Sequence, residues 1–243
     1  MIKQAIRKSV NCSKSTISKS DVICHRTKME AAKTVSIIGE KTMIIINNLN
    51  SNECNEERPN VNLGLIPDEL KTYNQWVPWK YGEEHSNGKS RTTKMPYSTK
   101  GTIARVNEPK TWDSYENVVA VYNGGRWSGI GFVFTGIDPF GGLDYDGVRN
   151  PDTGEWNSEL LVEIISLGSY AEISPSGEGA HVIFKGSVPG PKHRNGCREM
   201  YDKNRYFTVT GNHIPGTPLE IKEVSEKILA SVYAKIDAKK GEC

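Results

Sequence analysis

The chain has no long apolar run, and this shortage excludes a membrane-spanning protein. The longest apolar stretch near its beginning, MIIINN, is far shorter than a bilayer crossing, and the first twenty residues lack the apolar block of a secretory signal. We therefore expect no membrane partner and a cytoplasmic location.

Cysteine is also scarce, with five residues in 243 and no C-x-x-C pair. An odd, scattered set predicts no disulfide framework, and its spacings fit no common zinc knuckle. The five are Cys12, Cys24, Cys54, Cys197 and Cys243.

The formal net charge of +2 conceals a patterned distribution. Residues 89–110 hold six Lys or Arg against Glu108 alone, whereas residues 144–163 hold six acids against Arg149 alone. Basic surface beside a compact acidic site suits a protein that binds a polyanion and also holds cations. Solvated loops of both signs are the alternative.

Composition divides the chain at about residue 62. Residues 1–62 are rich in Ser, Lys, Asn and Thr and show weak periodicity, which is typical of a basic, disordered arm and linker. Residues 63–238 alternate apolar runs with turn signals and form the expected folded domain.

Within this domain, strands interleaved with helices and then a series of short strands predict an α+β fold with a sheet covered by helices. We expect 129–136 and 141–147 to be a pair of strands joined by a turn. The other expected strands are 75–84, 92–99, 169–177, 179–186, 198–202 and 205–211, and the expected helices are 111–123, 158–168 and 223–236.

The segment GGLDYDG, residues 141–147, carries the first candidate site. Side chains alternate along a strand, so Asp144 and Asp146 share one face while Tyr145 points to the other. Two adjacent carboxylates repel unless a cation lies between them, and Mg²⁺ or Mn²⁺ prefers such oxygen ligands. A surface turn is one alternative. A calcium loop with Asn150, Asp152 and Glu155 is another, disfavoured because Arg149 stands where an EF-hand needs glycine.

Two later segments carry further candidates. In SPSGEGAHVIFKG, residues 174–186, backbone amides around Ser176, Gly177 and Gly179 can approach a phosphate, and His181 can present its imidazole to it. The alternative is a glycine-rich hairpin with a core histidine.

The second of these segments is CREMYDKNRYFTVTG, residues 197–211. Glu199 offers a third carboxylate there, with Asp202 as runner-up and Arg205 among the nearby cations. A hydrated charged hairpin is the alternative.

In this order and spacing the three segments resemble the archaeo-eukaryotic primase superfamily, and most closely the primase-polymerase domains of phages and plasmids. The resemblance covers roughly residues 65–215. It matches Asp144 and Asp146 to the family's D-x-D strand, Ser176 to His181 to its S-x-H strand, and Glu199 to its later acidic strand. It implies the family's catalytic core, with an RNA-recognition-motif-like sheet covered by helices.

The resemblance also implies a function, a template-directed DNA primase or polymerase of a phage, plasmid or other mobile element. Two Mg²⁺ or Mn²⁺ ions would be held by Asp144, Asp146 and Glu199, and His181 would orient the triphosphate with Ser176, Gly177 and Gly179. Lys94 and Arg205 are candidates for further phosphate contacts.

The implied partners are a single-stranded DNA template and NTP or dNTP, in a bacterial or archaeal host cell. Because the chain has no G-x-x-x-x-G-K-[ST] loop, we expect either a separate helicase or that the chain is a fragment of a longer primase-helicase. Residues 89–110 would contact the template, with Trp76, Trp79 or Tyr97 as stacking groups, although tryptophans at alternate strand positions more often lie in a core. The alternative function is an inactive single-stranded nucleic-acid binding module derived from such a primase.

Overall fold

The computed structural model describes residues 37–38, 41–42, 59–86 and 89–238. The chain divides into two units, residues 1–54 and 55–243. In the first unit, β1 (Ile37–Ile38) and β2 (Lys41–Thr42) form an antiparallel pair. The expected arm of residues 1–62 lies almost entirely outside the described residues, so its disorder stays a prediction.

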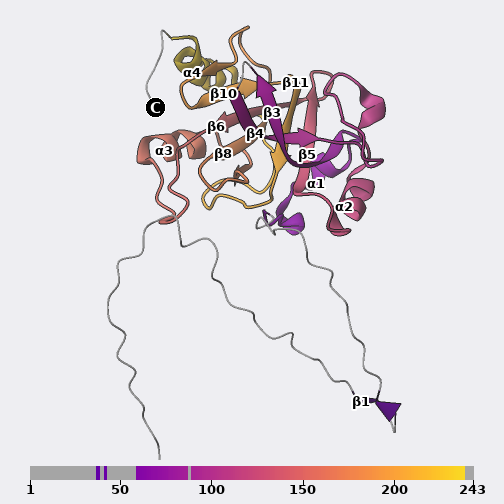
Figure 1. Ribbon diagram of the computed structural model, residues 1–243. Helices are drawn as coiled ribbons and strands as arrows, with labels where there is room; N and C mark the ends of the chain where they lie inside the picture. Colours follow the sequence, from indigo (N-terminus) through magenta and orange to yellow (C-terminus); the bar gives the residue numbers. More distant parts are fainter. Residues whose placement is uncertain (1–36, 39–40, 43–58, 87–88, 239–243) are drawn as a thin grey trace, which may run out of the picture. The chain divides into compact units, whose positions relative to one another are not determined.

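The second unit contains two antiparallel sheets (Figure 1). A four-stranded sheet has the order β11-β5-β3-β4, and a five-stranded sheet has the order β7-β8-β6-β10-β9. The strands of the first sheet are β3 (Trp76–Ser86), β4 (Lys89–Pro96), β5 (Gly129–Thr135) and β11 (Lys203–Val209). Those of the second are β6 (Phe140–Tyr145), β7 (Ala171–Ile173), β8 (Ala180–Lys185), β9 (Arg194–Asn195) and β10 (Arg198–Tyr201).

Helices occupy the connections between these strands. They are α1 (Asp68–Lys71), α2 (Tyr115–Asn123), α3 (Ser158–Ser166) and α4 (Glu226–Asp237), with 3₁₀ turns η1 (Leu63–Leu65) and η2 (Pro109–Thr111). The side chain of Asn157 caps α3 by accepting from the amides of Glu159 and Leu160, and Gly168, at φ 63°, follows its end. Mixed helices and antiparallel strands confirm the α+β class at this level.

One expected pairing is wrong. Residues 129–135 and 140–145 both form strands joined by a turn, but β5 and β6 lie in different sheets. Both edges of β5 are occupied, by β3 and β11, and both edges of β6 by β8 and β10. The Asp138 carboxylate accepts from the amides of Thr135 and Phe140 and so fixes the turn between the two sheets.

Two apolar layers hold the second unit together. Leu143 and Tyr145 of β6 face a core that α3 and α4 complete, on the side where Figure 1 shows these helices. The opposite face of this sheet contributes to an aromatic core shared with the four-stranded sheet. At Gly142 an added Cβ would lie 2.5 Å from the Phe207 ring and 2.8 Å from that of Phe134. Glycine therefore lets the two sheets approach directly beside the D-x-D segment.

The structure bears on two expectations of the sequence analysis, those about membrane-spanning segments and about disulfides. In the part of the chain that the structure describes, none of the helices combines the length and apolar character needed to cross a bilayer. Cys197 is disulfide-bonded, a pairing that the sequence analysis did not predict when it argued against a disulfide framework.

Candidate active site

A row of five polar side chains crosses the five-stranded sheet at one level. In the strand register, Glu172 of β7 pairs with His181 of β8, and His181 with Asp144 of β6. Asp144 pairs with Glu199 of β10, and Glu199 with Arg194 of β9. Directly opposed residues place their side chains on the same face of a sheet. The strand order thus assembles a charged row from segments that are far apart in the sequence.

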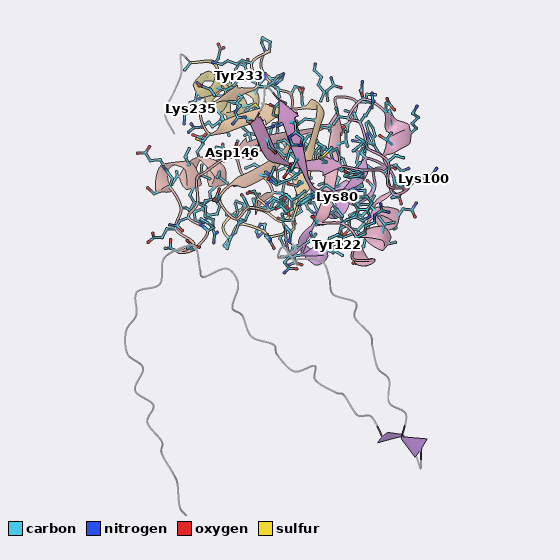
Figure 2. The ribbon with its side chains drawn as sticks, in the orientation of Figure 1. Lys80, Lys100, Tyr122, Asp146, Tyr233 and Lys235 are labelled. Carbon is cyan, nitrogen blue, oxygen red and sulfur yellow. The ribbon has the colours of Figure 1, made fainter. Side chains whose placement is uncertain are left out.

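Four members of this row, all except Glu172, line a cavity of about 810 Å³ between the two sheets. The cavity is lined by six of the residues that the sequence analysis selected, which are Lys94, Asp144, Asp146, His181, Glu199 and Arg205. Figure 2 shows Asp146 between α4, marked by Tyr233 and Lys235, and strands β3 and β4. Strand β4 supplies the opposite wall with its segment Arg91–Lys94.

The two aspartates differ in their surroundings. The Asp144 side chain is 21% exposed, and burial raises the pKa of its carboxyl. His181 opposes this shift, whereas Asp146 and Glu199 add to it, and the pKa stays above its ordinary value. Asp146 is exposed, with Oδ2 3.7 Å from Arg194 Nη2. Asp144 is therefore a carboxylate whose charge is unfavourable until a cation comes close.

His181 lies between two carboxylates. Its Nε2 is 3.7 Å from Asp144 Oδ1, and its Nδ1 is 3.5 Å from Glu172 Oε1. Burial by itself lowers the pKa of this imidazole, but Glu172 and Asp144 outweigh burial and raise it. The ring is buried between these two carboxylates, and its Nδ1 faces Glu172 at 3.5 Å without forming a hydrogen bond in this structure.

Glu172 is the site residue that sequence reasoning missed. Its side chain is fully buried and accepts hydrogen bonds from Tyr170 Oη at 2.7 Å and from the amides of Thr210 and Gly211 at 2.9 and 2.8 Å. The signal for it was a lone acid in the apolar run SYAEIS, since a glutamate is seldom fully buried without partners.

Glu199 is the third carboxylate of the row, and its oxygens already have partners. Oε1 lies 2.9 Å from Arg194 Nη1, and Oε2 accepts from Arg205 Nη2 at 3.0 Å and from Tyr201 Oη at 2.9 Å. Asp202 lies elsewhere, because its Oδ2 accepts from the Val188 amide at 2.9 Å and it is not among the cavity-lining residues. The geometry favours Glu199 over Asp202 as the acid of the site.

The aspartate pair fits a divalent cation better than the full set of three acids does. Asp144 and Asp146 both line the cavity and offer carboxylate oxygens to a cation. Burial and the nearby acids Asp146 and Glu199 disfavour the charged form of Asp144. Glu199 is instead neutralised by two arginines. Within the described residues, no three His, Cys, Asp or Glu side chains are grouped as a metal site.

Lys94 and Arg205 bring positive charge to the same cavity. Burial lowers the pKa of Lys94, and the nearby Asp144 and Asp146 partly offset this shift. The Lys94 carbonyl accepts a hydrogen bond from Tyr206 Oη, which ties β4 to β11 across the cavity. The partly buried Lys94 ammonium lies near two acids, and it is well placed to bind a negatively charged ligand such as a phosphate group.

The structure does not bring Ser176, Gly177 and Gly179 to the cavity lining. Ser176 Oγ lies 3.1 Å from Ser174 Oγ, and the Gly177 carbonyl accepts from Arg149 Nη1 at 2.8 Å. A Cβ at Gly179 would lie 2.4 Å from the Tyr145 carbonyl oxygen. These residues form the turn directly before β8, the strand that contains His181. Their contact with a phosphate stays a prediction.

The tryptophans proposed for base stacking lie in the core. Trp76 and Trp79 are 0% and 1% exposed, and their indole N–H groups donate to the carbonyls of Leu70 and Ile130. The core alternative is therefore confirmed for both. Tyr97 is half-buried, with the Lys80 ammonium 5.0 Å from its ring centre.

The fold and the site together define a mixed α/β domain in which a D-x-D strand, a histidine strand and a glutamate strand lie side by side. The comparison with known proteins confirms that this domain resembles phage-type primase-polymerase domains. The relative is the DNA Primase-polymerase of Nitratiruptor phage NrS-1, 37% identical over 170 residues. The match covers 66% of this chain and 22% of that protein, so this chain spans well under two thirds of its relative. No family model matches the chain.

Proposed function

We propose that this chain is a template-directed nucleotidyltransferase, a DNA primase or DNA polymerase of a phage, plasmid or other mobile-element replication system. The observation that carries the proposal is the register of His181, Asp144 and Glu199 on three adjacent strands at the wall of one cavity. The similarity to a phage DNA primase-polymerase supports the same activity. The proposal includes a separate helicase that exposes the template strand.

The charge of the cavity suits a nucleoside triphosphate with its cations. Three acids, Asp144, Asp146 and Glu199, face five cations among the described lining residues. The cations are Arg91, Lys94, Arg105, Arg194 and Arg205. A purely basic cavity would bind phosphate without any means to hold a metal, whereas this mixture offers oxygen donors beside phosphate-binding groups.

Asp144 and Asp146 would hold Mg²⁺ or Mn²⁺, with Glu199 as a further ligand. Two bound ions supply activation of a 3′-hydroxyl and neutralisation of the charge on the departing pyrophosphate. In the arrangement described above, Arg194 and Arg205 occupy the Glu199 oxygens. When these guanidinium groups turn toward phosphate oxygens, Glu199 becomes free to serve as a ligand.

His181 positions the triphosphate in this proposal. Nδ1 faces Glu172 on the buried side, so Nε2 is the nitrogen that points toward Asp144 at the cavity wall. A protonated ring would donate from Nε2 to a phosphate oxygen, a charge-stabilising role and not that of a general base. Lys94 and Arg205 would add charge-assisted contacts to the same phosphates.

Nucleotide incorporation on a single-stranded DNA template tests the proposal. Purified full-length protein, labelled nucleotides of both sugar classes and Mg²⁺ or Mn²⁺ should give template-dependent products. Asp144→Ala should abolish them while its circular dichroism spectrum stays that of the wild type. Template binding without incorporation by the wild type would overturn the proposal in favour of an inactive binding module.

A further inference from the structure

A second cavity, of about 470 Å³, lies next to the candidate active site. We call it the side cavity, and its lining includes Val106, Pro109, Trp112, Ile137, Pro139 and Asn204. It shares Val106, Asn107 and Asn204 with the larger cavity. A ligand chain that passes through the active site would therefore meet the side cavity at this shared border.

Several polar groups of the side cavity already have hydrogen-bond partners within the protein. Asp138 Oδ2 accepts from Gln75 Nε2 at 2.9 Å and from the Thr135 amide at 2.9 Å, and its Oδ1 accepts from the Phe140 amide. The Trp112 indole N–H donates to the Arg105 carbonyl at 2.8 Å. These bonds hold this part of the lining in place, and apolar faces together with the Asn107 and Asn204 side chains form the rest of its surface.

Ile137 is the most exposed large apolar residue that the structure describes, at 96%. It lies in the β5–β6 turn, where Thr135 Oγ1 accepts from its amide and holds the backbone. Single exposed apolar residues are common, so the exposure of Ile137 alone would not indicate a binding site. Here it borders an apolar cavity beside Trp112, which is what a stacking platform for a flat ring requires.

The border between the two cavities contains an unusual backbone conformation. Asn204, at φ 53°, is the non-glycine residue with positive φ within the described ranges, and the β11 pairing shifts register between Lys203 and Arg205 around it. Asparagine adopts this left-handed conformation more readily than other residues with side chains, so it fits the irregular point in the strand. The irregularity sets an amide side chain, able to bond a base edge, at the point where both cavities meet.

The charge around the side cavity favours a polyanion with an uncharged part inside. Asp138 is the charged member of the described lining, and its carboxylate is enclosed by donors. Outside it, Arg105 and Lys110 are 69% and 82% exposed and share Glu108 at 3.7 and 3.6 Å, and the Lys203 stem lies against the Gly136 turn. A triphosphate would find no cation inside, whereas a base could enter while its phosphates stay at the rim.

We infer that the side cavity binds the base of an unpaired nucleotide of the single-stranded template, next to the nucleotide that is being copied. This inference rests on the proposed function, because it takes the larger cavity as the place of copying. The base stacks on Trp112 and Ile137, Asn204 meets its edge, and the flanking phosphates lie near Arg105 and Lys203.

Photocrosslinking locates the base directly. A primed template with an unpaired 5′ tail carries one 5-iodouracil, placed in turn at the copied position and at each of the next three, and crosslinked peptides are identified by mass spectrometry. We expect the position next to the copied base to attach to Trp112 or Tyr73. Crosslinks confined to residues other than Tyr73 and segments 106–112 and 135–139 would overturn the inference.

Binding of the same DNA, measured by fluorescence anisotropy, gives a second readout. Trp112→Ala should weaken it about 5- to 150-fold, the effect of losing one stacked base, and Trp112→Phe should retain most of the affinity. Trp112 also packs against the buried cluster of Val77, Ala104 and Val133, so its replacement could disturb the fold. Ile137→Ser supplies a second variant, because the Ile137 side chain is almost fully exposed. It should weaken binding several-fold, whereas Val162→Ser, 66% exposed on α3, should leave it unchanged.

The outcomes separate this inference from the proposed function. If the wild type incorporates nucleotides but Ile137→Ser binds like Val162→Ser, the side cavity does not hold the template and the enzyme proposal stands. If crosslinks form at Trp112 while no nucleotide is ever incorporated, the side cavity binds single-stranded DNA and the enzyme proposal fails.

Discussion

At the scale of single residues, the buried Glu172 carboxylate decides how His181 meets the cavity. It is the neighbour of Nδ1, and it is itself anchored by Tyr170 and two backbone amides. A carboxylate behind a working histidine fixes the orientation of the ring and stabilises its charged form. Glu172 is thus a positioning residue.

We predict that Glu172→Gln lowers kcat/KM for nucleotide incorporation about 10- to 100-fold, the loss typical for removal of a carboxylate behind a metal-ligating histidine, which serves as the order of magnitude for His181. A separate stability effect is expected because Glu172 also holds the Thr210 and Gly211 amides. Tyr170→Phe is the matched control, since it removes one hydrogen bond to the same carboxylate without touching His181. Equal kinetic losses in both variants would show that Glu172 acts through stability alone.

At the scale of elements, the D-x-D strand is held from behind by a buried ionic cluster. Glu163 of α3 accepts from Tyr145 Oη at 3.1 Å and from Arg198 Nε and Nη2 at 2.8 and 3.1 Å, and Lys235 of α4 bonds to it as well. The cluster therefore joins α3, α4, β6 and β10. It anchors Tyr145, whose two neighbours are the aspartates that face the cavity.

This cluster predicts a loss of stability in acid. Burial alone raises the pKa of Glu163, but Arg198 and Lys235 outweigh it and lower that pKa below its ordinary value. A carboxyl with a lowered folded pKa stabilises the fold above its unfolded pKa, about 4.3, and this contribution disappears as pH falls through the folded value. Chemical denaturation at several pH values should show a free energy of unfolding that falls below about pH 4.3.

Glu163→Gln tests the source of this dependence. The variant should lose about 1–3 kcal/mol of unfolding free energy at pH 7, because it leaves Arg198 half-buried without a charged partner, and its acid dependence should be weaker. Glu159→Gln, exposed on the same helix, should change stability by less than about 0.5 kcal/mol. An unchanged acid slope in Glu163→Gln would assign the effect to other carboxyls.

The order of elements was largely readable from the sequence, and their pairing was not. Alternation and glycine signals located β3, β5, β6, β8 and β11, and the capping pattern located α2 and α3. The same signals cannot say which strands pair, so the sequence suggested one hairpin where β5 and β6 enter separate sheets. The two-residue strand β9, which brings Arg194 to Glu199, is too short to leave a periodic signal.

For the site, residue chemistry and family resemblance selected Asp144, Asp146, His181 and Glu199, and the structure places all four at one cavity. Sequence reasoning could not find Arg194, because its importance comes from cross-strand register. For Glu172 the lone acid in SYAEIS was a local signal, but the sequence did not show that the register places it beside His181. It also could not place the tail of the S-x-H segment, where Ser176 and Gly177 turn away toward Ser174 and Arg149.

At the scale of the whole molecule, the distribution of charge should govern template binding. Five cations line the larger cavity, and residues 89–110 supply three of them, Arg91, Lys94 and Arg105. Neutralising phosphates releases counterions, so the logarithm of the affinity for single-stranded DNA should fall linearly with the logarithm of salt, by about 0.7 per phosphate contacted.

Arg105→Gln should reduce this salt slope by about 0.7, since it removes one such contact. Fluorescence anisotropy titrations between low and moderate salt measure the slope, and Lys227→Gln, on the exposed part of α4, is the control that should leave it unchanged. A slope near zero in the wild type would exclude phosphate contacts as the basis of binding.

The most direct measurement of the central claim is incorporation directed by homopolymer templates, each offered one labelled nucleotide at a time. The wild type should incorporate the complementary nucleotide and discriminate against the others. Asp144→Asn, which keeps the size of the side chain, should incorporate none, and Asp152→Asn, in an exposed loop outside the cavity lining, should match the wild type. Incorporation by Asp144→Asn at the wild-type rate, or none by the wild type with any nucleotide, would contradict the account.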